Sequence, residues 1–291
     1  MFDSLNVLSM LDTLVEFDWL AHEGQIRLTA FVSAFAVLAL WEVLFPRRPL
    51  SVSKPLRWVN NLALMLVNTL VLRFMLPVLA VGMALQIESQ GWGFFNMVEW
   101  PFWLEGLLVI LLLDLGIYWQ HRLMHVVPIL WRLHRMHHSD RDLDVTSAIR
   151  FHPLEILLSM LYKLLMIALL GPSFIAVIAF EVLLNALSLF THANGYMPVQ
   201  WDKRLRVVFV TPDMHRIHHS KYHRNETNSN YGVLTSLWDR LFKSYSHDPI
   251  EGQSGITLGV EGFSSIKRAQ HLTGLLITPF EIGRASCRER V

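Results

Sequence analysis

Residues 114–138 read DLGIYWQHRLMHVVPILWRLHRMHH and hold five of the chain's 14 histidines, just where a long apolar run stops. A second HxxHH pattern follows at His215, His218 and His219. We interpret the rest of the sequence as a scaffold that brings these clusters together at one face of a membrane. The pattern indicates a histidine-rich metal site.

The composition of the 291 residues is that of a polytopic membrane protein, with 53% hydrophobic and 17% charged residues. The formal net charge of +1 leaves no basic footprint for nucleic acid. Cys287 is the sole cysteine, which excludes disulfides, CxxC zinc sites and thiolate-held iron–sulfur clusters within the chain. Any metal must therefore use nitrogen or oxygen ligands.

Five apolar runs predict an all-α integral membrane fold with four to five transmembrane or re-entrant helices. They cover residues 26–45, 58–85, 102–120, 153–170 and 173–190. About 20 apolar residues suffice to cross a bilayer core of roughly 30 Å. Gly171-Pro172 is a turn signal, so we expect the last two runs to form a hairpin whose outer ends share one side.

The charges of the loops predict the orientation. The first loop carries Arg47, Arg48, Lys54 and Arg57, and such enrichment marks the cytoplasmic side. Residues 86–101 contain acids but no Lys or Arg and should lie outside. The third run then delivers His121 to the cytoplasmic face, where His152 and His192 flank the hairpin. We therefore predict a cytosolic histidine-rich cap that holds two metals.

The HxxHH spacing has a chemical meaning in a helix. Positions i, i+3 and i+4 share a face, while adjacent residues point about 100° apart. One triplet is therefore suited to serve two neighbouring metals, and neutral imidazole suits iron, copper, nickel and zinc. The candidate ligands are His121, His125, His134, His137, His138, His152, His192, His215, His218 and His219.

The remaining histidines are expected to have ordinary roles. His22, His247 and His271 are isolated residues, which are more often interfacial or hydrogen-bonded than metal ligands. His223 follows His219 by four residues, so a place in the site is open to it, but we favour a surface role.

Two acids lie close to the histidine boxes. Asp114 is seven residues before His121 inside an apolar helix, and we expect it to fix a ligating histidine, with a buried structural role as the alternative. Asp213 precedes His215 by two residues, and it either takes a similar role or caps the N-terminus of a helix.

Other metal chemistries fit less well. Arg122 and Arg135 follow His121 and His134, so neither box is the HExxH of a zincin protease. Heme ligation within the membrane is disfavoured because the histidines cluster at helix ends. A non-catalytic membrane metal-binding or transport protein is the alternative of a different class, although transport calls for polar residues along a path across the membrane.

The motifs together resemble those of the fatty acid hydroxylase superfamily, which includes sterol desaturases, sphingolipid and fatty-acid hydroxylases and alkylglycerol monooxygenases. The likeness runs from about residue 114 to residue 245. It rests on HRLMH, HRMHH, RFHPLE (150–155), THAN (191–194), DMHRIHHS, ETNSNYG (226–232) and WDRLF (238–242). The interval of eight residues between the first two boxes also resembles this family rather than the acyl-CoA desaturases.

The resemblance implies a non-heme di-iron centre that uses O2 as co-substrate. By it, eight histidines of the boxes are the iron ligands, with His152 and His192 as further members. Some relatives carry another histidine four residues after the position of His192, where this chain has Tyr196. This departure puts the ligand number of one metal in question, and His152 or a water is expected to fill the gap.

The implied reaction is hydroxylation or desaturation of a lipid C–H bond in a fatty acyl, sterol or ether lipid. Cleavage of an ether lipid after hydroxylation beside its oxygen belongs to the same chemistry. Electrons are expected from a separate ferredoxin, cytochrome b5 or reductase. The basic residues proposed to dock an acidic donor are Lys203, Arg204, Arg206, Lys221 and Arg224. The membrane is the plasma membrane of a bacterium or the endoplasmic reticulum of a eukaryote.

We expect four segments along the chain. Residues 1–101 form a lead-in and two membrane helices, residues 102–250 a catalytic domain like that of the family, and residues 251–281 a C-terminal segment. Residues 282–291 (IGRASCRERV) resemble a translated sequencing adapter. On that expectation the tail and Cys287 are not native, and the native C-terminus is missing after about residue 281.

Overall fold

The computed structural model describes residues 18–263 and 265–281, and the regular elements in these ranges are all helices. The first part of the expected lead-in and the adapter-like tail with Cys287 lie outside the described residues. The fold is that of an all-α integral membrane protein, as predicted. Its five candidate spans are Glu23–Leu44, Lys54–Asn96, Phe102–Val126, Pro153–Leu170 and Phe174–His192.

These spans correspond closely to the predicted apolar runs. Four of them are the single helices α2 (Glu23–Leu44), α5 (Phe102–Val126), α7 (Pro153–Leu170) and α8 (Phe174–His192). The second span contains α3 (Lys54–Met75), α4 (Ala80–Ser89) and η1 (Phe94–Asn96). It breaks where Pro77 follows the end of α3, because proline has no backbone N–H and its ring excludes a helical predecessor.

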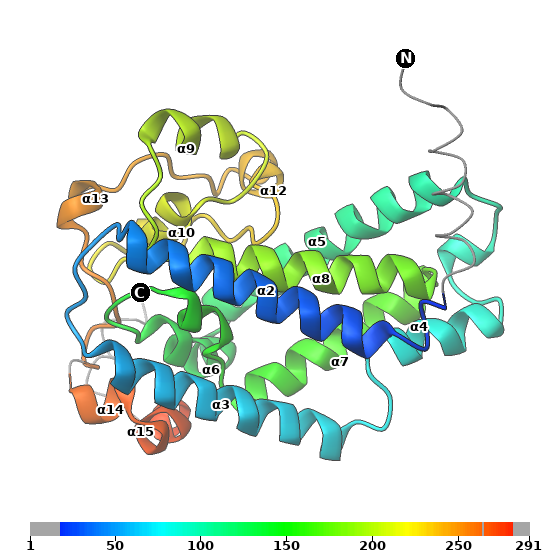
Figure 1. The fold of residues 1–291 in the computed structure, drawn as a ribbon, viewed down its shortest axis with the longest axis horizontal. Helices are drawn as coiled ribbons and strands as arrows, with labels where there is room; N and C mark the ends of the chain where they lie inside the picture. Colours follow the sequence, from blue (N-terminus) through cyan, green and yellow to red (C-terminus); the bar gives the residue numbers. More distant parts are fainter. Residues whose placement is uncertain (1–17, 264, 282–291) are drawn as a thin grey trace.

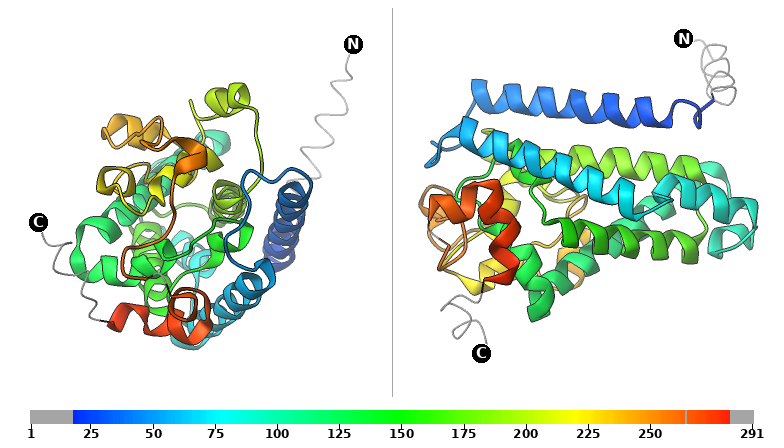
Figure 2. Two further views of the ribbon diagram at one scale, coloured as in Figure 1. Left: turned by 90° about the vertical axis from the view of Figure 1, so that its left-hand side faces the viewer. Right: turned by 90° about the horizontal axis from the view of Figure 1, so that it is seen from below.

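The long helices alternate in direction along the longest axis of the molecule (Figure 1, Figure 2). Consequently α2, α5 and α8 end where α3 and α7 begin, on the left of Figure 1. Gly171, at φ 62°, ends α7 in the left-handed conformation that glycine adopts at low cost, and the hairpin of α7 and α8 turns back there. Both outer ends of the hairpin therefore lie at the end that carries the histidine boxes.

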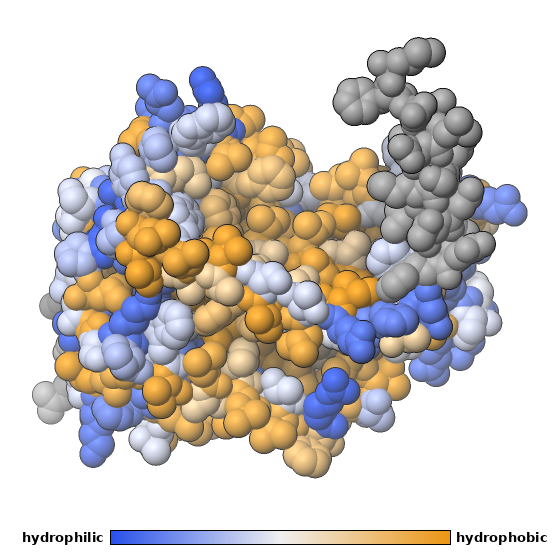
Figure 3. Space-filling model, viewed as in Figure 1, coloured by the Kyte–Doolittle hydropathy of each residue, from blue (hydrophilic) through white to orange (hydrophobic). Residues whose placement is uncertain are grey.

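Apolar contacts hold α4, α5, α7 and α8 together, with Val109, Ile167 and Phe180 fully buried between them. Outward-facing side chains such as Leu66 and Phe74 are exposed, and apolar residues cover most of the flank of the bundle (Figure 3). A lipid environment accounts for this exposure, because acyl chains are as apolar as these side chains.

The end that holds the histidine boxes is capped by short helices and loops. The first are α6 (Pro128–His138), η2 (Val145–Ile149), α9 (Val199–Leu205) and α10 (Pro212–His218). They are followed by α11 (Arg224–Thr227), α12 (Leu237–Leu241), α13 (Gly252–Gly255), α14 (Ile266–Gln270), α15 (Leu272–Ile277) and η3 (Thr278–Phe280).

A buried ion pair anchors the cap to the bundle. Arg57 belongs to α3, is fully buried and donates to Asp140 at 2.8 and 3.0 Å and also to Asp144. Asp140 lies just after α6, so this pair ties the helix that carries His134, His137 and His138 to α3. Arg57, which the sequence places among the charges of an exposed loop, is thus a structural residue.

Candidate metal centre

Nine histidines converge at the capped end of the bundle in two groups. The first group is His121, His125, His134, His138 and His218, and the second is His137, His192, His215 and His219. Within each group, the candidate ligand atoms lie within 4.8 Å of one another. Two groups so close together, with imidazole donors alone, are suited to a pair of neighbouring metal ions.

The helix geometry distributes the boxes between the two groups. His121 and His125 lie one turn apart near the end of α5 and join the first group, while His192, the last residue of α8, joins the second. The adjacent residues His137 and His138 enter opposite groups, and so do His218 and His219. This is the division that the 100° offset of neighbouring helical residues predicts.

Hydrogen bonds orient three imidazoles of the first group. The Nδ1–H of His121 donates to the carbonyl of Tyr231 at 2.7 Å, and that of His218 donates to the carbonyl of Ser229 at 2.7 Å. The Nδ1–H of His134 donates to Oε1 of Glu155 at 2.6 Å. Since each of these partners only accepts, Nδ1 carries the proton and Nε2 keeps a free lone pair.

Hydrogen bonds orient two imidazoles of the second group in the same way. The Nδ1–H of His137 donates to the carbonyl of Arg150 at 3.1 Å, and that of His192 donates to the carbonyl of Ser188 at 2.8 Å. The Arg150 guanidinium is fully buried and donates to Ser139 Oγ at 2.7 Å and to the carbonyl of Ala269 at 2.6 Å. These bonds fix the position of Arg150, whose carbonyl accepts the hydrogen bond from His137.

The distances between neighbouring Nε2 atoms are those expected for ligands that surround one metal ion. The separations to His121 are 3.1 Å from His134 and 3.0 Å from His218. His192 lies 3.2 Å from His137 and 3.1 Å from His215. Two unprotonated nitrogens do not hydrogen-bond, whereas about 3 Å separates neighbouring ligands around a metal with metal–nitrogen distances of about 2.1 Å.

Several nitrogen atoms of the site also lack a protein partner. His125 Nε2 and both ring nitrogens of His138 are buried and make no hydrogen bond. Such groups are costly unless something else satisfies them. The residues therefore fit two metal ions, the first with five imidazole donors and the second with four.

Burial keeps these imidazoles in the neutral form that binds metals. It lowers the pKa of His218 to about 3, with neighbouring histidines such as His134 adding to the effect. Burial also holds the pKa values of His137, His138, His215 and His219 well below their usual range. Because metal ligation needs the deprotonated nitrogen, the site is ready to bind a metal without first losing protons.

One predicted ligand, His152, lies behind the two groups. His152 caps α7, where its Nδ1 accepts from the Leu154 N–H at 3.2 Å and its Nε2 donates to the carbonyl of Leu276 at 3.2 Å. It belongs to neither group of converging nitrogens. Tyr196 is 48% exposed, so it does not supply a further donor to the group of His192.

Asp114 supports the site by hydrogen bonds to a loop and not by a bond to a histidine side chain. Its carboxylate accepts from the Thr235 hydroxyl and the Trp238 indole, each at 2.8 Å. It thereby anchors the loop whose Tyr231 carbonyl orients His121. The expectation of a direct bond from Asp114 to a ligating histidine is not what the structure shows.

Asp213 forms ion pairs instead of capping its helix. It accepts from Arg47 at 3.0 and 3.2 Å and also pairs with Arg216, while Thr211 is the N-cap of α10. The pair with Arg47 joins α10 to the loop after α2. Asp213 therefore fixes the position of the helix that carries His215 and His218.

The remaining histidines lie away from the two groups. His223 faces Glu251 with 3.6 Å between Nε2 and Oε1, in agreement with a surface role. His22 bonds to the carbonyl of Asp18, and His247 pairs with Asp248. His271 precedes α15 as its N-cap residue.

Sequence reasoning missed Glu155, which is the carboxylate in contact with a converging histidine. It is 3% exposed at the start of α7, and its Oε2 has no hydrogen-bond partner. An acid in the first turn of an apolar membrane helix was an available signal, since such residues are costly unless paired. The carbonyls of Tyr231, Ser229 and Arg150 left no signal, because every residue has one.

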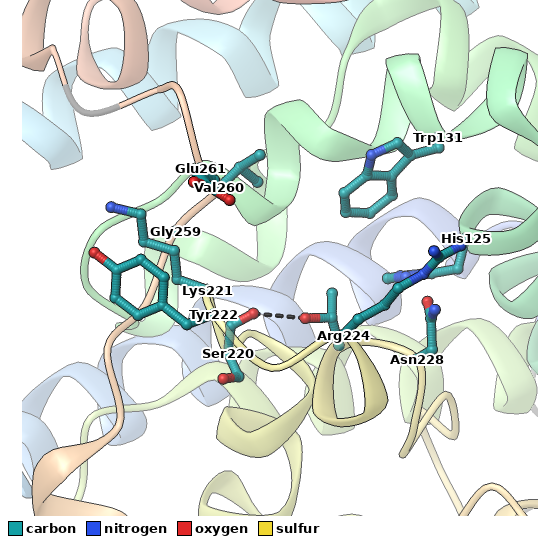
Figure 4. A pocket seen from close by; sticks show the side chains of 11 residues that line it. His125, Trp131, Ser220, Lys221, Tyr222, Arg224, Asn228, Gly259, Val260 and Glu261 are labelled. Atoms are coloured by element: carbon teal, nitrogen blue, oxygen red, sulfur yellow. Dashed lines mark hydrogen bonds between the residues drawn. The ribbon is translucent and has the colours of Figure 1, made fainter. Parts of the chain in front are cut away.

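A cavity of about 210 Å³ opens beside the first group. His125 and Trp131 form one side of it, and residues 220–228 and 259–261 form the others (Figure 4). It connects the surface of the cap with His125.

The sequence is similar to that of several characterised enzymes. The family described as Fatty acid hydroxylase matches residues 106–244. Ornithine lipid hydroxylase OlsE of Rhizobium tropici is 29% identical over 259 residues, which are 86% of this chain and 74% of that protein. Alkylglycerol monooxygenase of Xenopus tropicalis is 30% identical over 190 residues, which are 62% of this chain and 40% of that protein.

A third similarity is to Delta(7)-sterol 5(6)-desaturase of Eremothecium gossypii, 31% identical over 145 residues, or 49% of this chain and 37% of that protein. The chain thus spans about three quarters of the ornithine lipid hydroxylase but less than half of the other two. No solved structure matches the chain.

Proposed function

The chain belongs to the fatty acid hydroxylase superfamily, and from this premise we propose that it uses O2 to hydroxylate or desaturate a C–H bond of a membrane lipid. The observation that carries the proposal is the convergence of nine histidines, seven of them buried, in two adjacent groups at the capped end of the bundle. The named relatives are a hydroxylase, a monooxygenase and a desaturase of lipids, so an oxidoreductase is the shared activity. Membership of this family fits both hydroxylation, which gives an alcohol, and desaturation, which gives an alkene.

We infer that the metals are two iron ions. All the converging donors are imidazoles, which suit iron, copper, nickel and zinc, but zinc has no redox chemistry to offer. When bound, the two ions would supply the oxidising power by reacting with O2 and two electrons from outside. The first would be held by His121, His125, His134, His138 and His218, and the second by His137, His192, His215 and His219.

The residues of the chain have distinct tasks in this proposal. The carbonyls of Tyr231, Ser229, Arg150 and Ser188 and the Glu155 carboxylate hold the Nδ1 protons, which aims each Nε2 lone pair inward. The burial of the imidazoles excludes bulk water and so limits side reactions. The four-histidine group has fewer protein donors than the five-histidine group, and a water or substrate is expected to complete it.

The position of the centre suits a lipid substrate. It lies at the end of the spanning helices, where the apolar flank of the bundle meets the cap (Figure 1, Figure 3). Arg47, Arg48 and Lys54 lie at the same end, so the positive-inside rule assigns the cap to the cytoplasm. We take residues 102–250 as the catalytic domain, with residues 1–101 as the preceding membrane unit.

The C-terminal segment, residues 251–281, packs against the cap. Arg135 of α6 donates to the carbonyls of Thr278 and Glu281, each at 2.6 Å. We propose that this segment holds α6, and thereby His134, His137 and His138, against the bundle.

A separate electron donor is part of the proposal. Lys203 and Arg204 are exposed on α9, and we assign to them the docking of an acidic ferredoxin or cytochrome b5. Arg206 is buried and pairs with Asp202, so it is not available for docking. Reversal of charge at Lys203 and Arg204 should raise the KM for the donor, and an unchanged KM would refute this assignment.

A donor-free experiment tests the function itself. The purified protein, loaded with iron and reduced without O2, is freed of reductant and exposed to a measured amount of O2 in nanodiscs of lipid extract. Consumption of O2 by the intact protein, and not by a His218→Ala variant or a zinc-loaded sample, is expected. Bound iron that consumes no O2 would favour the non-catalytic metal-binding or transport alternative.

A further inference from the structure

We propose that the cavity beside His125 binds the acidic headgroup, a phosphate or carboxylate, of the lipid substrate. The proposal rests on the proposed function and adds to it the chemical class of the substrate's polar end. Three features carry it: the size and position of the cavity, the charges that line it, and the exposed apolar side chains that neighbour its inner wall in the sequence.

The cavity is suited to a headgroup rather than to a whole lipid. Its volume of about 210 Å³ is below the roughly 300–1,000 Å³ of pockets for drug-sized ligands. A long acyl chain therefore has to lie elsewhere. The inner wall is His125 and Trp131.

The charges around the cavity favour an anion. Lys221 and Arg224 stand on different sides, and the Arg224 side chain extends across the cavity toward His125 (Figure 4). Glu261 is the single acidic residue of the lining, so the lining carries two cationic side chains and one carboxylate. The amide of Asn228 adds a neutral polar group, and guanidinium and ammonium groups are the usual partners of phosphate and carboxylate.

The surroundings favour a lipid over a soluble acidic protein. The corner between α5 and α6, next to His125 and Trp131, presents Leu123, Val126 and Ile129 with 44%, 55% and 64% of their surfaces exposed. Such side chains are stable at a membrane surface and costly in water. A headgroup in the cavity can thus continue into an acyl chain that leaves along this apolar corner.

This arrangement also limits which carbon is oxidised. Because His125 belongs to the five-histidine group and forms the inner wall of the cavity, a headgroup held there places the first carbons beyond it next to the metal site. The oxidised carbon should therefore lie within or a few bonds from the headgroup, and not near the far end of the acyl chain.

Binding of a defined lipid tests the proposal without turnover. Isothermal titration calorimetry would compare the binding of dihexanoyl phosphatidic acid, dihexanoylglycerol and inorganic phosphate to the iron-loaded protein of 291 residues in a neutral detergent. The variants are Lys221→Gln, Arg224→Gln and both together. The matched control is Lys267→Gln, since Lys267 is exposed on α14 and does not line the cavity.

The intact protein and the control should bind phosphatidic acid at least tenfold more tightly than dihexanoylglycerol, and the double variant should lose this preference. Equal affinity for the two lipids, or full retention of the preference in the double variant, would overturn the proposal. Inorganic phosphate that binds as tightly as the lipid would show a site for a free anion, which also overturns it.

A second readout separates this proposal from the proposed function. O2 consumption by the reduced protein is measured on the same samples. Normal O2 consumption without a preference for the acidic lipid refutes the headgroup site alone. The preference without O2 consumption refutes the oxidative function and leaves the binding site in place. A gain in affinity for an acidic donor protein that depends on Lys221 and Arg224 would assign the cavity to the donor and overturn the proposal.

Discussion

Replacement of Glu155 by glutamine should weaken metal binding in one of the two histidine groups and spare the other. The carboxylate accepts the Nδ1 proton of His134 at 2.6 Å and is 3% exposed. Glutamine keeps an oxygen acceptor of similar shape but removes the negative charge. His134 then becomes a weaker donor to the group of His121, His125, His138 and His218, whereas the second group has no contact with Glu155.

The size of the effect follows from the hydrogen bond. A bond with one charged partner contributes about 1.5–3 kcal/mol. Loss of a partner that orients a ligating histidine usually costs about 10- to 100-fold in metal affinity. This factor corresponds to about 1.4–2.7 kcal/mol, in agreement with the first figure. We therefore expect the affinity of the five-histidine group to fall by about one to two orders of magnitude.

The assay is the iron content of the purified protein after equilibration with a graded series of chelator concentrations. The intact protein should lose its two ions at similar free iron, and Glu155→Gln should lose one of them at about 10- to 100-fold higher free iron. Glu105→Gln is the matched control. Glu105 accepts from the Ser173 N–H at 2.8 Å near the opposite end of the bundle.

Two results would refute this reasoning. If Glu155→Gln retained both ions as firmly as the intact protein, the Glu155–His134 bond would have no part in metal binding. If the variant lost both ions in parallel, the two groups would not be the independent sites that their donor sets indicate. A loss that Glu105→Gln shared would point to unfolding.

Three further predictions follow from the site and its support. His218→Ala should remove the ion of the first group, and His215→Ala that of the second, so that metal analysis finds about one ion per chain in each; complete loss in both would contradict this. Arg57→Met leaves Asp140 and Asp144 buried without their cation and should cost about 3–5 kcal/mol of unfolding free energy; a change below about 1 kcal/mol in denaturant unfolding would be evidence against the anchor. The metal-free protein should be most stable above about pH 6.5. The folded pKa of His218 is about 3, so the unfolded chain takes up its proton first as the pH falls. Stability should then decline by about 1.4 kcal/mol per pH unit for each such histidine, and thermal unfolding curves that stay constant from pH 7 to about pH 5 would contradict this.

Much of the architecture was predictable because it depends on local patterns. Apolar runs of about 20 residues and a Gly-Pro turn define spans and a hairpin from sequence alone. The HxxHH spacing further predicted that His137 and His138 would serve different metals, since their directions on a helix differ by about 100°. These features need only the period of the helix and the thickness of the bilayer.

The unpredictable parts depend on contacts between distant segments. Glu155 and His134 are 21 residues apart, and nothing in the spacing shows that α7 brings the one to the other. Arg57 lies in a basic stretch of sequence that predicts a loop, yet the structure buries its side chain completely against the residues after α6. His152 lies at the entrance of the hairpin as predicted, but its Nε2 bonds to the carbonyl of Leu276 and does not join the converging nitrogens.

The most direct test of the central claim is mass spectrometry of total lipids from cells that express the protein under isotopically labelled dioxygen (18O2). We predict an 18O-labelled lipid, or a lipid that has lost two hydrogens, in cells with the intact protein and in neither His218→Ala nor His215→Ala cells. The structure and the lipid headgroup of that product would name the substrate. A lipid profile that is the same in all three strains, with iron bound and O2 consumed by none of them, would contradict the claim that the two histidine groups form an oxidative centre.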